Sequence, residues 1–550
     1  MSHPHNEPTK QVPTSQEGIP APEGPANLID TDYVIGQDNI TPAPLGIRLD
    51  LHGKVFTISA LVVLFFVFIT LALQEQVAPL FTGIFNFLTT NLSWFFIFAA
   101  NIFVLLTLVL IFTPLGKVRL GGQDATPDFS YPGWFAMLFA AGMGIGLMYF
   151  GVSEPLGHFN AALSGPVMEN GVRIDWAPLG GAEGDAAAAA SLGMAATIFH
   201  WGLHPWAIYA IVALALALFS FNKGLPLTMR SVFYPILGER VWGWPGHIID
   251  ILAVFATLFG LATSLGLGAT QATNGLNDLF GIPNTNTTMV VLIVAITLVA
   301  MGSVVLGVDK GVQRLSQLNI ALALLLLLFV IVVGPTLLIL TGFFQNLGSY
   351  IKHLPALAMP FGREDANFVS GWTAFYWAWW ISWSPFVGMF IARVSRGRTV
   401  REFLISVLLV PSLVSVLWMT AFGGTAISQT LQGVFADSPV DELFIMLSGL
   451  PLTQITSFIA IVLVLVFFIT SSDSGSLVID SITSGGKVNA PTSQRIFWAI
   501  LEGAIAIALL LGGGLAALQA MAVSTGLPFT LVLLVSCYAI VKGLMSEPRA

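Results

Sequence analysis

The sequence has one cysteine, Cys537, and an unusually small share of charged residues. A single thiol excludes a disulfide framework and a cysteine-based zinc cluster. Asp, Glu, Lys and Arg account for 9% of the 550 residues, against about 25% in a soluble domain. The net charge of −8 comes without a basic face of the kind that binds nucleic acid. These absences argue against a soluble scaffold and against a nucleic-acid-binding protein.

Apolar residues are abundant instead and make up 55% of the sequence. A helix crosses a bilayer with about 20 consecutive apolar residues, and twelve segments are long enough. Their approximate bounds are 55–74, 91–114, 132–152, 192–218, 246–274, 286–307, 317–341, 367–394, 403–425, 452–481, 494–521 and 526–545. The sequence therefore predicts an all-α integral membrane protein with twelve transmembrane helices.

Polar segments flank and separate these spans. Residues 1–50 are Pro-rich and carry seven acidic residues against two basic ones, so we expect a disordered acidic cytoplasmic tail. The stretch 153–191 is too polar to span and predicts an external loop with some helix. Residues 342–366 predict a second external connection, an amphipathic helix along the membrane surface. Residues 546–550 form a short cytoplasmic tail.

The basic residues are distributed unevenly between the two sides of the membrane. With the N-terminus inside, 18 of the 21 Lys and Arg residues fall in tails, cytoplasmic loops or adjoining helix ends. Only Arg173, Lys352 and Arg363 fall in external connections. Because basic residues are enriched on the cytoplasmic side, both termini are predicted to be cytoplasmic, in a plasma (cell inner) membrane.

The spans divide into a leading pair and two halves. Residues 51–131 hold two N-terminal helices and a cytoplasmic loop, and 132–341 and 367–545 hold five helices each, in opposite orientation. Each half opens with a helix that carries unusual residues at mid-membrane, 142–146 in the third span and 379–385 in the eighth. Interrupted segments at matching places in two inverted repeats indicate a transporter binding site.

Aromatic residues concentrate in the middle of two spans. The eighth contains Trp-Ala-Trp-Trp-Ile-Ser-Trp at 377–383, and the fourth contains three large aromatics between His200 and Tyr209. Tryptophan in membrane proteins usually lies at the water interfaces instead. Either cluster alone is more often packing, but two clusters at one depth favour a shared cage. Aromatic faces in a dry pocket attract a quaternary ammonium ion through the ring quadrupoles.

Two further segments suggest an ion site, each with an alternative. Glycines at 142, 144 and 146 indicate either close helix packing or local unwinding that frees carbonyl oxygens for a cation. In the tenth span, the hydroxyls of Thr470 and Ser471 either hold sodium or bond back to their own helix. Asp473 is either a functional acid or a local acceptor.

No catalytic constellation is evident in the sequence. His200 and His204 have the spacing of a metal pair without a third acidic or thiol ligand, so structural roles are favoured. Glu154, before Pro155, is expected to end the third helix and fix a loop. Without a metal cluster or a nucleophile–base pair, we expect no enzyme and no cofactor beyond a coupling ion.

These segments resemble the betaine/carnitine/choline transporter family. The matching stretches are 142–148, 200–209 and 375–386, the last running on into 393–398, and the resemblance covers about residues 50–545. It implies the leucine-transporter fold, with five-plus-five inverted repeats after two extra helices. It also implies alternating access and a homotrimer surrounded by membrane lipids.

The resemblance further implies roles for individual residues. The substrate would be held by Trp201, Trp206, Tyr209, Trp379, Trp380, Trp383, Gly144 and Gly146. Tyr149 and Phe375 look like gate or lining aromatics. The sodium site would comprise Ala140, Met143, Phe467, Thr470 and Ser471. A second sodium site would use Thr257 and Phe386, although Leu261 stands where the family has a second threonine.

Substrate charge and coupling ion follow from the same resemblance. Proton-coupled choline carriers of the family tend to have an aspartate where this chain has Gly146. A cation in a dry site needs a countercharge, whereas a zwitterion brings its own, so Gly146 favours a zwitterion such as glycine betaine. The Trp-Ser-Pro-Phe pattern at 383–386 favours sodium symport over exchange. The hypothesis is sodium-coupled import of a quaternary-ammonium compatible solute; the alternative is proton-coupled uptake of choline or another quaternary amine.

Overall fold

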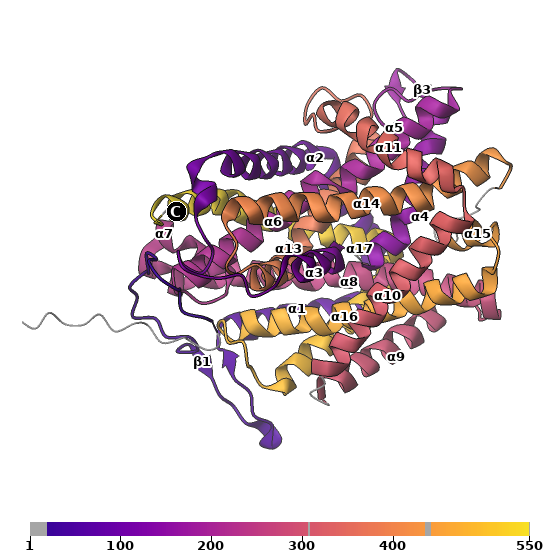
Figure 1. Ribbon diagram of the computed structural model, residues 1–550. Helices are drawn as coiled ribbons and strands as arrows, with labels where there is room; N and C mark the ends of the chain where they lie inside the picture. Colours follow the sequence, from indigo (N-terminus) through magenta and orange to yellow (C-terminus); the bar gives the residue numbers. More distant parts are fainter. Residues whose placement is uncertain (1–18, 143, 306–308, 435–441, 549–550) are drawn as a thin grey trace, which may run out of the picture.

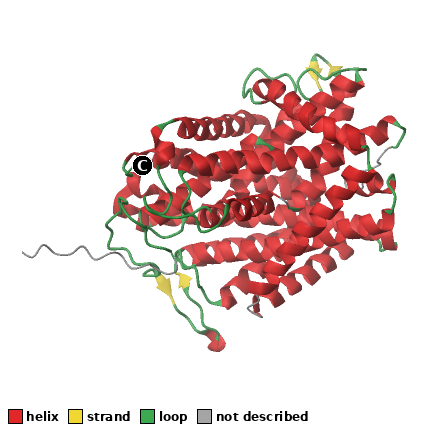
Figure 2. Ribbon diagram, in the orientation of Figure 1, coloured by secondary structure: helices red, strands yellow, loops and turns green. Residues whose placement is uncertain are grey.

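A computed structural model describes residues 19–142, 144–305, 309–434 and 442–548. They form a bundle of long helices with two short hairpins, which confirms the predicted all-α membrane class (Figures 1 and 2). The helices are α1 (Val55–Ala72), α2 (Gln74–Phe112), α3 (Tyr131–Gly142), α4 (Ile145–Ser164), α5 (Ala186–Trp201), α6 (Leu203–Ala217), α7 (Tyr234–Leu237), α8 (Trp244–Phe280), α9 (Asn286–Val305), α10 (Asp309–Val333), α11 (Thr336–Leu357), α12 (Ala366–Phe368), α13 (Ala374–Val394), α14 (Val400–Leu431), α15 (Glu442–Ser448), α16 (Thr453–Thr483) and α17 (Thr492–Met545). The strands are β1 (Asn39–Ile40), β2 (Leu51–His52), β3 (Met168–Glu169) and β4 (Val172–Arg173), and each hairpin is antiparallel.

Nine helices among the described residues are long and apolar enough to cross a bilayer, or ten if α3 and α4 form one bent span. The axes of α3 and α4 differ by 66°. Gly144, just before α4, is in an extended conformation with φ −165° and ψ −176°. A non-helical residue here supports unwinding over simple packing of a continuous helix. Twelve spans in two repeats stay a prediction.

Two predicted span boundaries are wrong. The segment 317–341 is not one helix, because α10 ends at Val333 and α11 begins after Pro335, which has no N–H to continue the helix. The last two predicted spans both lie in α17, and the break is not between them. It lies earlier, at Gly513 and Gly514, whose backbone angles are non-helical. A straight helix of 54 residues would be about 81 Å long, far beyond the bilayer, so this kink is needed.

Residues 1–18 of the predicted disordered tail, 1–50, lie outside the described residues. Residues 19–50 instead make contacts with the helix bundle, and we call residues 19–54 the N-terminal strap. The Tyr33 ring stacks on Trp242 at 4.1 Å, and its hydroxyl accepts a 2.8 Å hydrogen bond from Arg230. Burial raises the pKa of Tyr33 to about 12, so the phenol stays protonated. Asp50 forms an ion pair with Lys487 in the α16–α17 connection. The acidic composition that suggested disorder is here partly neutralised by basic side chains of the helix connections.

The densest cluster of basic residues in the sequence lies at the end of α13 and the start of α14, and its arginines anchor this connection. Arg398 bonds to Glu402 at 2.7 Å and lies over the Tyr131 and Trp134 rings of α3. Arg396 pairs with Glu23 of the strap and, at 2.9 Å, with Asp128. These contacts bring the strap, the start of α3 and the end of α13 together.

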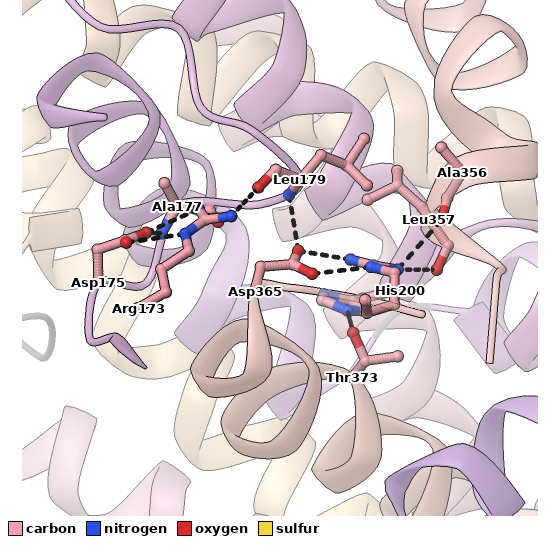
Figure 3. Close-up of polar contacts among 10 residues, drawn as sticks. Arg173, Asp175, Ala177, Leu179, His200, Ala356, Leu357, Asp365 and Thr373 are labelled. Carbon is pink, nitrogen blue, oxygen red and sulfur yellow. Dashed lines mark hydrogen bonds and ion pairs between the residues drawn. The ribbon is translucent and has the colours of Figure 1, made fainter. Parts of the chain in front are cut away.

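The two long polar connections, 165–185 and 358–365, meet at the end of the bundle opposite the C-terminus and β1 (Figure 1). Asp365 joins them, because it accepts a hydrogen bond from the Leu179 N–H at 2.6 Å and forms a two-point ion pair with Arg363 (Figure 3). Hydrogen bonds from Arg173 lower the pKa of Asp175 to about 2, so this carboxylate is charged at any physiological pH.

Candidate functional site

A cavity of about 580 Å³ lies inside the bundle, between the α3–α4 break and helices α5, α6, α10, α13 and α16. It holds twelve of the residues predicted for the site. These are Ala140, Gly144, Gly146, Trp201, Tyr209, Trp379, Trp380, Trp383, Phe386, Phe467, Thr470 and Ser471. The lining residues, all of them described, include no carboxylate, ammonium or guanidinium group. The cavity is therefore uncharged and mostly aromatic at one end.

The aromatic end is built by α5, α6 and α13. The ring of Trp380 lies 5.1 Å from Trp201, at 87°, and 5.3 Å from Tyr209, at 76°. Trp379 adds a third indole, 5.9 Å from Trp380. The helix is interrupted at Gly202, between α5 and α6. This interruption turns Trp201 toward the aromatic residues of α6. The rings of the two predicted clusters thus converge on one cavity.

Polar anchors behind the wall hold three of the indoles. Trp201 donates to Glu154 Oε2 at 2.7 Å, Trp380 to the His200 carbonyl at 2.9 Å, and Trp383 to the Gly260 carbonyl at 2.8 Å. By contrast, the Trp379 Nε1 and the Tyr209 hydroxyl have no hydrogen-bond partner among the described residues. Both donor atoms are buried, so neither is exposed to the cavity.

The start of α4 supplies the third wall. A Cβ placed at Gly146 would lie 2.7 Å from Trp379 Cη2 and 3.0 Å from Trp201 Cη2, closer than side chains normally approach. Glycine is therefore needed for the rings to close over the backbone. The first N–H groups of a helix have no intrahelical acceptor and carry a partial positive charge. At α4 these groups lie at Ile145 and Gly146, both of which line the cavity.

The end of the cavity at α16 carries oxygen atoms. Thr470 Oγ1 bonds back to the Val466 carbonyl at 3.0 Å, as the alternative interpretation proposed, but Thr470 and Ser471 also line the cavity. Asn319 of α10 approaches Thr470 Oγ1 with Nδ2 at 3.4 Å, and its buried Oδ1 has no partner among the described residues. Amide and hydroxyl oxygens are ligands of small hard cations, and Asn319, Thr470 and Ser471 all line this end of the cavity. Met143, predicted for this site, lies outside the described residues.

Four predicted residues lie outside the cavity lining. Trp206 is buried and contacts Tyr209 edge-on at 5.4 Å. Phe375 stacks on the Trp379 ring at 5.5 Å, and Tyr149 packs on Phe150 at 4.7 Å. Thr257 bonds back to the Ala253 carbonyl at 2.8 Å. Trp206 and Phe375 thus support rings that line the cavity, and Thr257 is not brought to the oxygen-rich end.

Sequence reasoning misplaced Glu154. It does not end a helix; it lies inside α4, is fully buried, and accepts hydrogen bonds from His158, His200, Trp201 and a tyrosine of α13. The missing acidic partner of His200 is this residue. The four-residue spacing of Glu154 and His158 was the one sequence signal that could have indicated the pair.

Asp473 and Asn319 were also incompletely read. Asp473 forms an ion pair with Arg495 of α17 at 2.9 Å, in addition to local contacts. Asn319 was not predicted for the site at all, because a single amide in an apolar helix gives no periodic signal.

The described structure is thus a multi-span membrane protein with an uncharged aromatic cavity at a helix break. The profile of the BCCT, betaine/carnitine/choline family transporter, matches residues 54–549. The chain belongs to this family.

Several named transporters are similar to this chain over most of its length. A glycine betaine/proline/choline transporter of Vibrio parahaemolyticus is 66% identical over 97% of both chains. Glycine betaine transporter 1 of the same organism is 52% identical, covering 95% of this chain and 98% of the relative. Glycine betaine transporter OpuD of Bacillus subtilis is 45% identical, over 84% and 88%. These relatives are transporters, and the chain is a membrane transporter, not an enzyme.

Proposed function

We propose that the protein imports a zwitterionic quaternary-ammonium compatible solute, glycine betaine or a close analogue, by sodium symport. The observation that carries this proposal is the uncharged lining of the aromatic cavity. A trimethylammonium group is attracted by ring faces without any hydrogen bond, at about 0.5–2 kcal/mol per contact. A solute without net charge needs no countercharge from the wall.

The substrate carboxylate would be bound at the α4 end of the cavity. Ile145 and Gly146, at the start of α4, line the cavity, and their N–H groups have no intrahelical acceptor. Helix N-termini bind anions through such N–H groups and the helix dipole. The cationic head against Trp201 and Trp380 and the carboxylate against α4 define one orientation of the solute.

Sodium would be bound at the α16 end by Thr470, Ser471 and a carbonyl of the α3–α4 break, with Asn319 Oδ1 as a further oxygen. Both ligands would then hold the broken α3–α4 segment in one conformation. Two ligands that favour the same conformation bind cooperatively, which is the thermodynamic basis of coupling. Thr257 bonds back to the Ala253 carbonyl and does not line the cavity, so no observation supports a second sodium there.

The remaining features of the proposal concern the whole assembly. We propose twelve spans in two inverted repeats that rock about the cavity, both termini in the cytoplasm of the cell inner membrane, and a homotrimer. The positive-inside distribution of Lys and Arg supports the orientation. The α3–α4 break and the aromatic α13, which open the two halves, support the repeats.

The alternative is proton-coupled uptake of choline or another quaternary amine. One observation favours a wider substrate range, since the relative at 66% identity is named for choline and proline as well as glycine betaine. Proline is also a zwitterion and fits an uncharged cavity, whereas choline would have to enter without a wall carboxylate.

Uptake into proteoliposomes tests the proposal. Labelled glycine betaine should accumulate with an inward sodium gradient and not with an inward proton gradient at equal sodium. Unlabelled glycine betaine, proline, choline, ectoine and carnitine would be compared as competitors. Uptake that ignores the sodium gradient would refute the coupling, and choline as the strongest competitor would favour the alternative.

A further inference from the structure

Glu154 is the centre of a buried hydrogen-bond cluster just outside the aromatic cavity. Its Oε1 is 2.6 Å from His200 Nδ1 and 3.2 Å from His158 Nε2. Its Oε2 accepts from Trp201 Nε1 at 2.7 Å and from the Tyr376 hydroxyl. The side chain of Glu154 is completely buried and does not line the cavity. Four donors from α4, α5 and α13 thus converge on one carboxyl group.

The cluster has no cationic partner from lysine or arginine among the described residues. A carboxylate removed from water is costly unless hydrogen bonds replace its hydration. Four donors supply that replacement, and each is in turn held in one orientation by the acceptor. A network of this kind fixes geometry, because moving any one donor leaves the carboxylate less satisfied.

The cluster reaches the cavity by two routes. The first is direct, since the indole bonded to Glu154 is the Trp201 ring that lines the cavity. The second passes through His200, whose Nε2 lies 3.0 Å from Thr373 Oγ1 (Figure 3) and whose carbonyl accepts from Trp380. In the right-angled pair of Trp201 and Trp380, one corner of the cavity, Trp201 is therefore held from behind by Glu154 and Trp380 by the backbone of His200.

A metal ion is a different possible occupant of this cluster. The ligand atoms of Glu154, His158 and His200 lie within 4.8 Å of one another. However, the 2.6 Å contact between Glu154 Oε1 and His200 Nδ1 is a hydrogen-bond distance, which a proton on Nδ1 accounts for without an ion. Protons on the two imidazoles satisfy the carboxylate without an ion.

We infer that Glu154 is a positioning residue for substrate binding, which fixes the Trp201 ring and thereby the shape of the aromatic cavity. The inference rests on the proposed function, because the ligand is the same quaternary-ammonium solute. In Glu154→Gln, an NH₂ group would replace one of the two carboxylate oxygens. The two donors that bond to that oxygen would then lose their acceptor. Trp201 would then be free to leave the cavity wall.

A double-mutant cycle tests this inference. Dissociation constants for glycine betaine would be measured by calorimetry, with saturating sodium, for the full-length protein, Glu154→Gln, Trp201→Phe and the double variant. We expect Glu154→Gln to weaken binding about tenfold in the normal background but less than about threefold with Trp201→Phe, because phenylalanine has no N–H to hold. Equal losses in both backgrounds would overturn the role through Trp201.

Glu502→Gln is the matched control. Glu502 is an equally buried acid, on α17, which accepts a hydrogen bond from Ser472 at 3.0 Å and does not line the cavity. Its replacement should change the glycine betaine dissociation constant less than about threefold. A loss as large as that of Glu154→Gln would show a general effect of removing a buried acid, and would also overturn the inference.

A measurement without substrate separates this inference from the proposed function. The fluorescence of Trp201 is obtained as the difference between proteins with and without Trp201→Phe. Acrylamide should quench this fluorescence more strongly in Glu154→Gln than in Glu502→Gln. Unchanged quenching would refute positioning even if transport were intact. Absence of glycine betaine binding by the unmodified protein would instead refute the proposed function. If the purified protein contained one equivalent of zinc and Glu154→Gln contained none, the cluster would be a metal site and the positioning role would be refuted.

Discussion

The two ends of the cavity are held in different ways. At the aromatic end, Trp201, Trp380 and Trp383 each donate their N–H to an acceptor outside the cavity. At the α16 end, Thr470 bonds only to its own helix and, at a long 3.4 Å, to Asn319. The aromatic wall is therefore complete before a ligand binds, whereas the oxygen-rich wall has unused acceptors. A binding wall that is already ordered loses less conformational entropy when a ligand binds. The oxygen atoms of the other wall gain their missing partner only when an ion binds between them.

The largest expected effect is at the aromatic end. Trp380→Ala removes a ring that contacts both Trp201 and Tyr209, and one cation–π contact in a desolvated site is worth up to about 2 kcal/mol. We expect the half-saturating concentration for glycine betaine uptake to rise at least about tenfold. Trp380→Phe, which keeps a ring face, should be milder. Equal transport by the alanine variant would show that this wall does not bind the substrate.

A similar loss of affinity is expected at the α16 end, but for sodium and not for glycine betaine. Thr470→Val removes a hydroxyl and keeps the volume. The half-saturating sodium concentration should rise about fivefold to tenfold, with glycine betaine affinity at saturating sodium nearly unchanged. Ser476→Ala is the control, because Ser476 bonds the Asp473 carbonyl and does not line the cavity. A change in betaine affinity alone would contradict the division between the two ends.

The closeness of backbone and rings can be tested at Gly146. Gly146→Ala places a methyl group 2.7 Å from Trp379 and should raise the half-saturating betaine concentration about fivefold. Gly157→Ala, in the same helix with open space around it, is the control. An aspartate at 146 faces the same contact, so any gain in choline transport would have to exceed a steric loss. No effect of alanine would mean that the rings are mobile.

The smallest effect is expected at Trp206, which supports the aromatic end from outside the lining. Trp206→Phe should change the betaine concentration for half-maximal uptake less than about twofold, because edge-on contact with Tyr209 is retained. A loss as large as that of Trp380→Ala would show that Trp206 reaches the substrate in another conformation.

Much of the site could be predicted because its residue types are rare in a membrane interior. Clustered tryptophans and repeated glycines stand out against leucine and valine, and twelve of the predicted residues line one cavity. Glu154 was misjudged for the opposite reason. Its partners are 4, 46, 47 and 222 residues away, so only the first leaves a local pattern.

Boundaries inside long apolar stretches were equally hard to predict. The break in α17 falls at glycines 513 and 514 within uninterrupted apolar sequence. Glycine permits a kink but does not require one, and the choice depends on packing against neighbouring helices. The N-terminal strap is a similar case, because its acidic residues are ordered by arginines and lysines distant in the chain.

By itself, the sequence determined the membrane class, the family and the aromatic character of the binding region, because hydropathy and residue type are properties of each segment alone. Only the tertiary structure decided which rings share a cavity, that no charged group enters its lining, and that one buried acid holds the Trp201 ring in its wall. Those facts depend on distances between helices, and bonds between side chains far apart in the chain leave no spacing that a sequence can show.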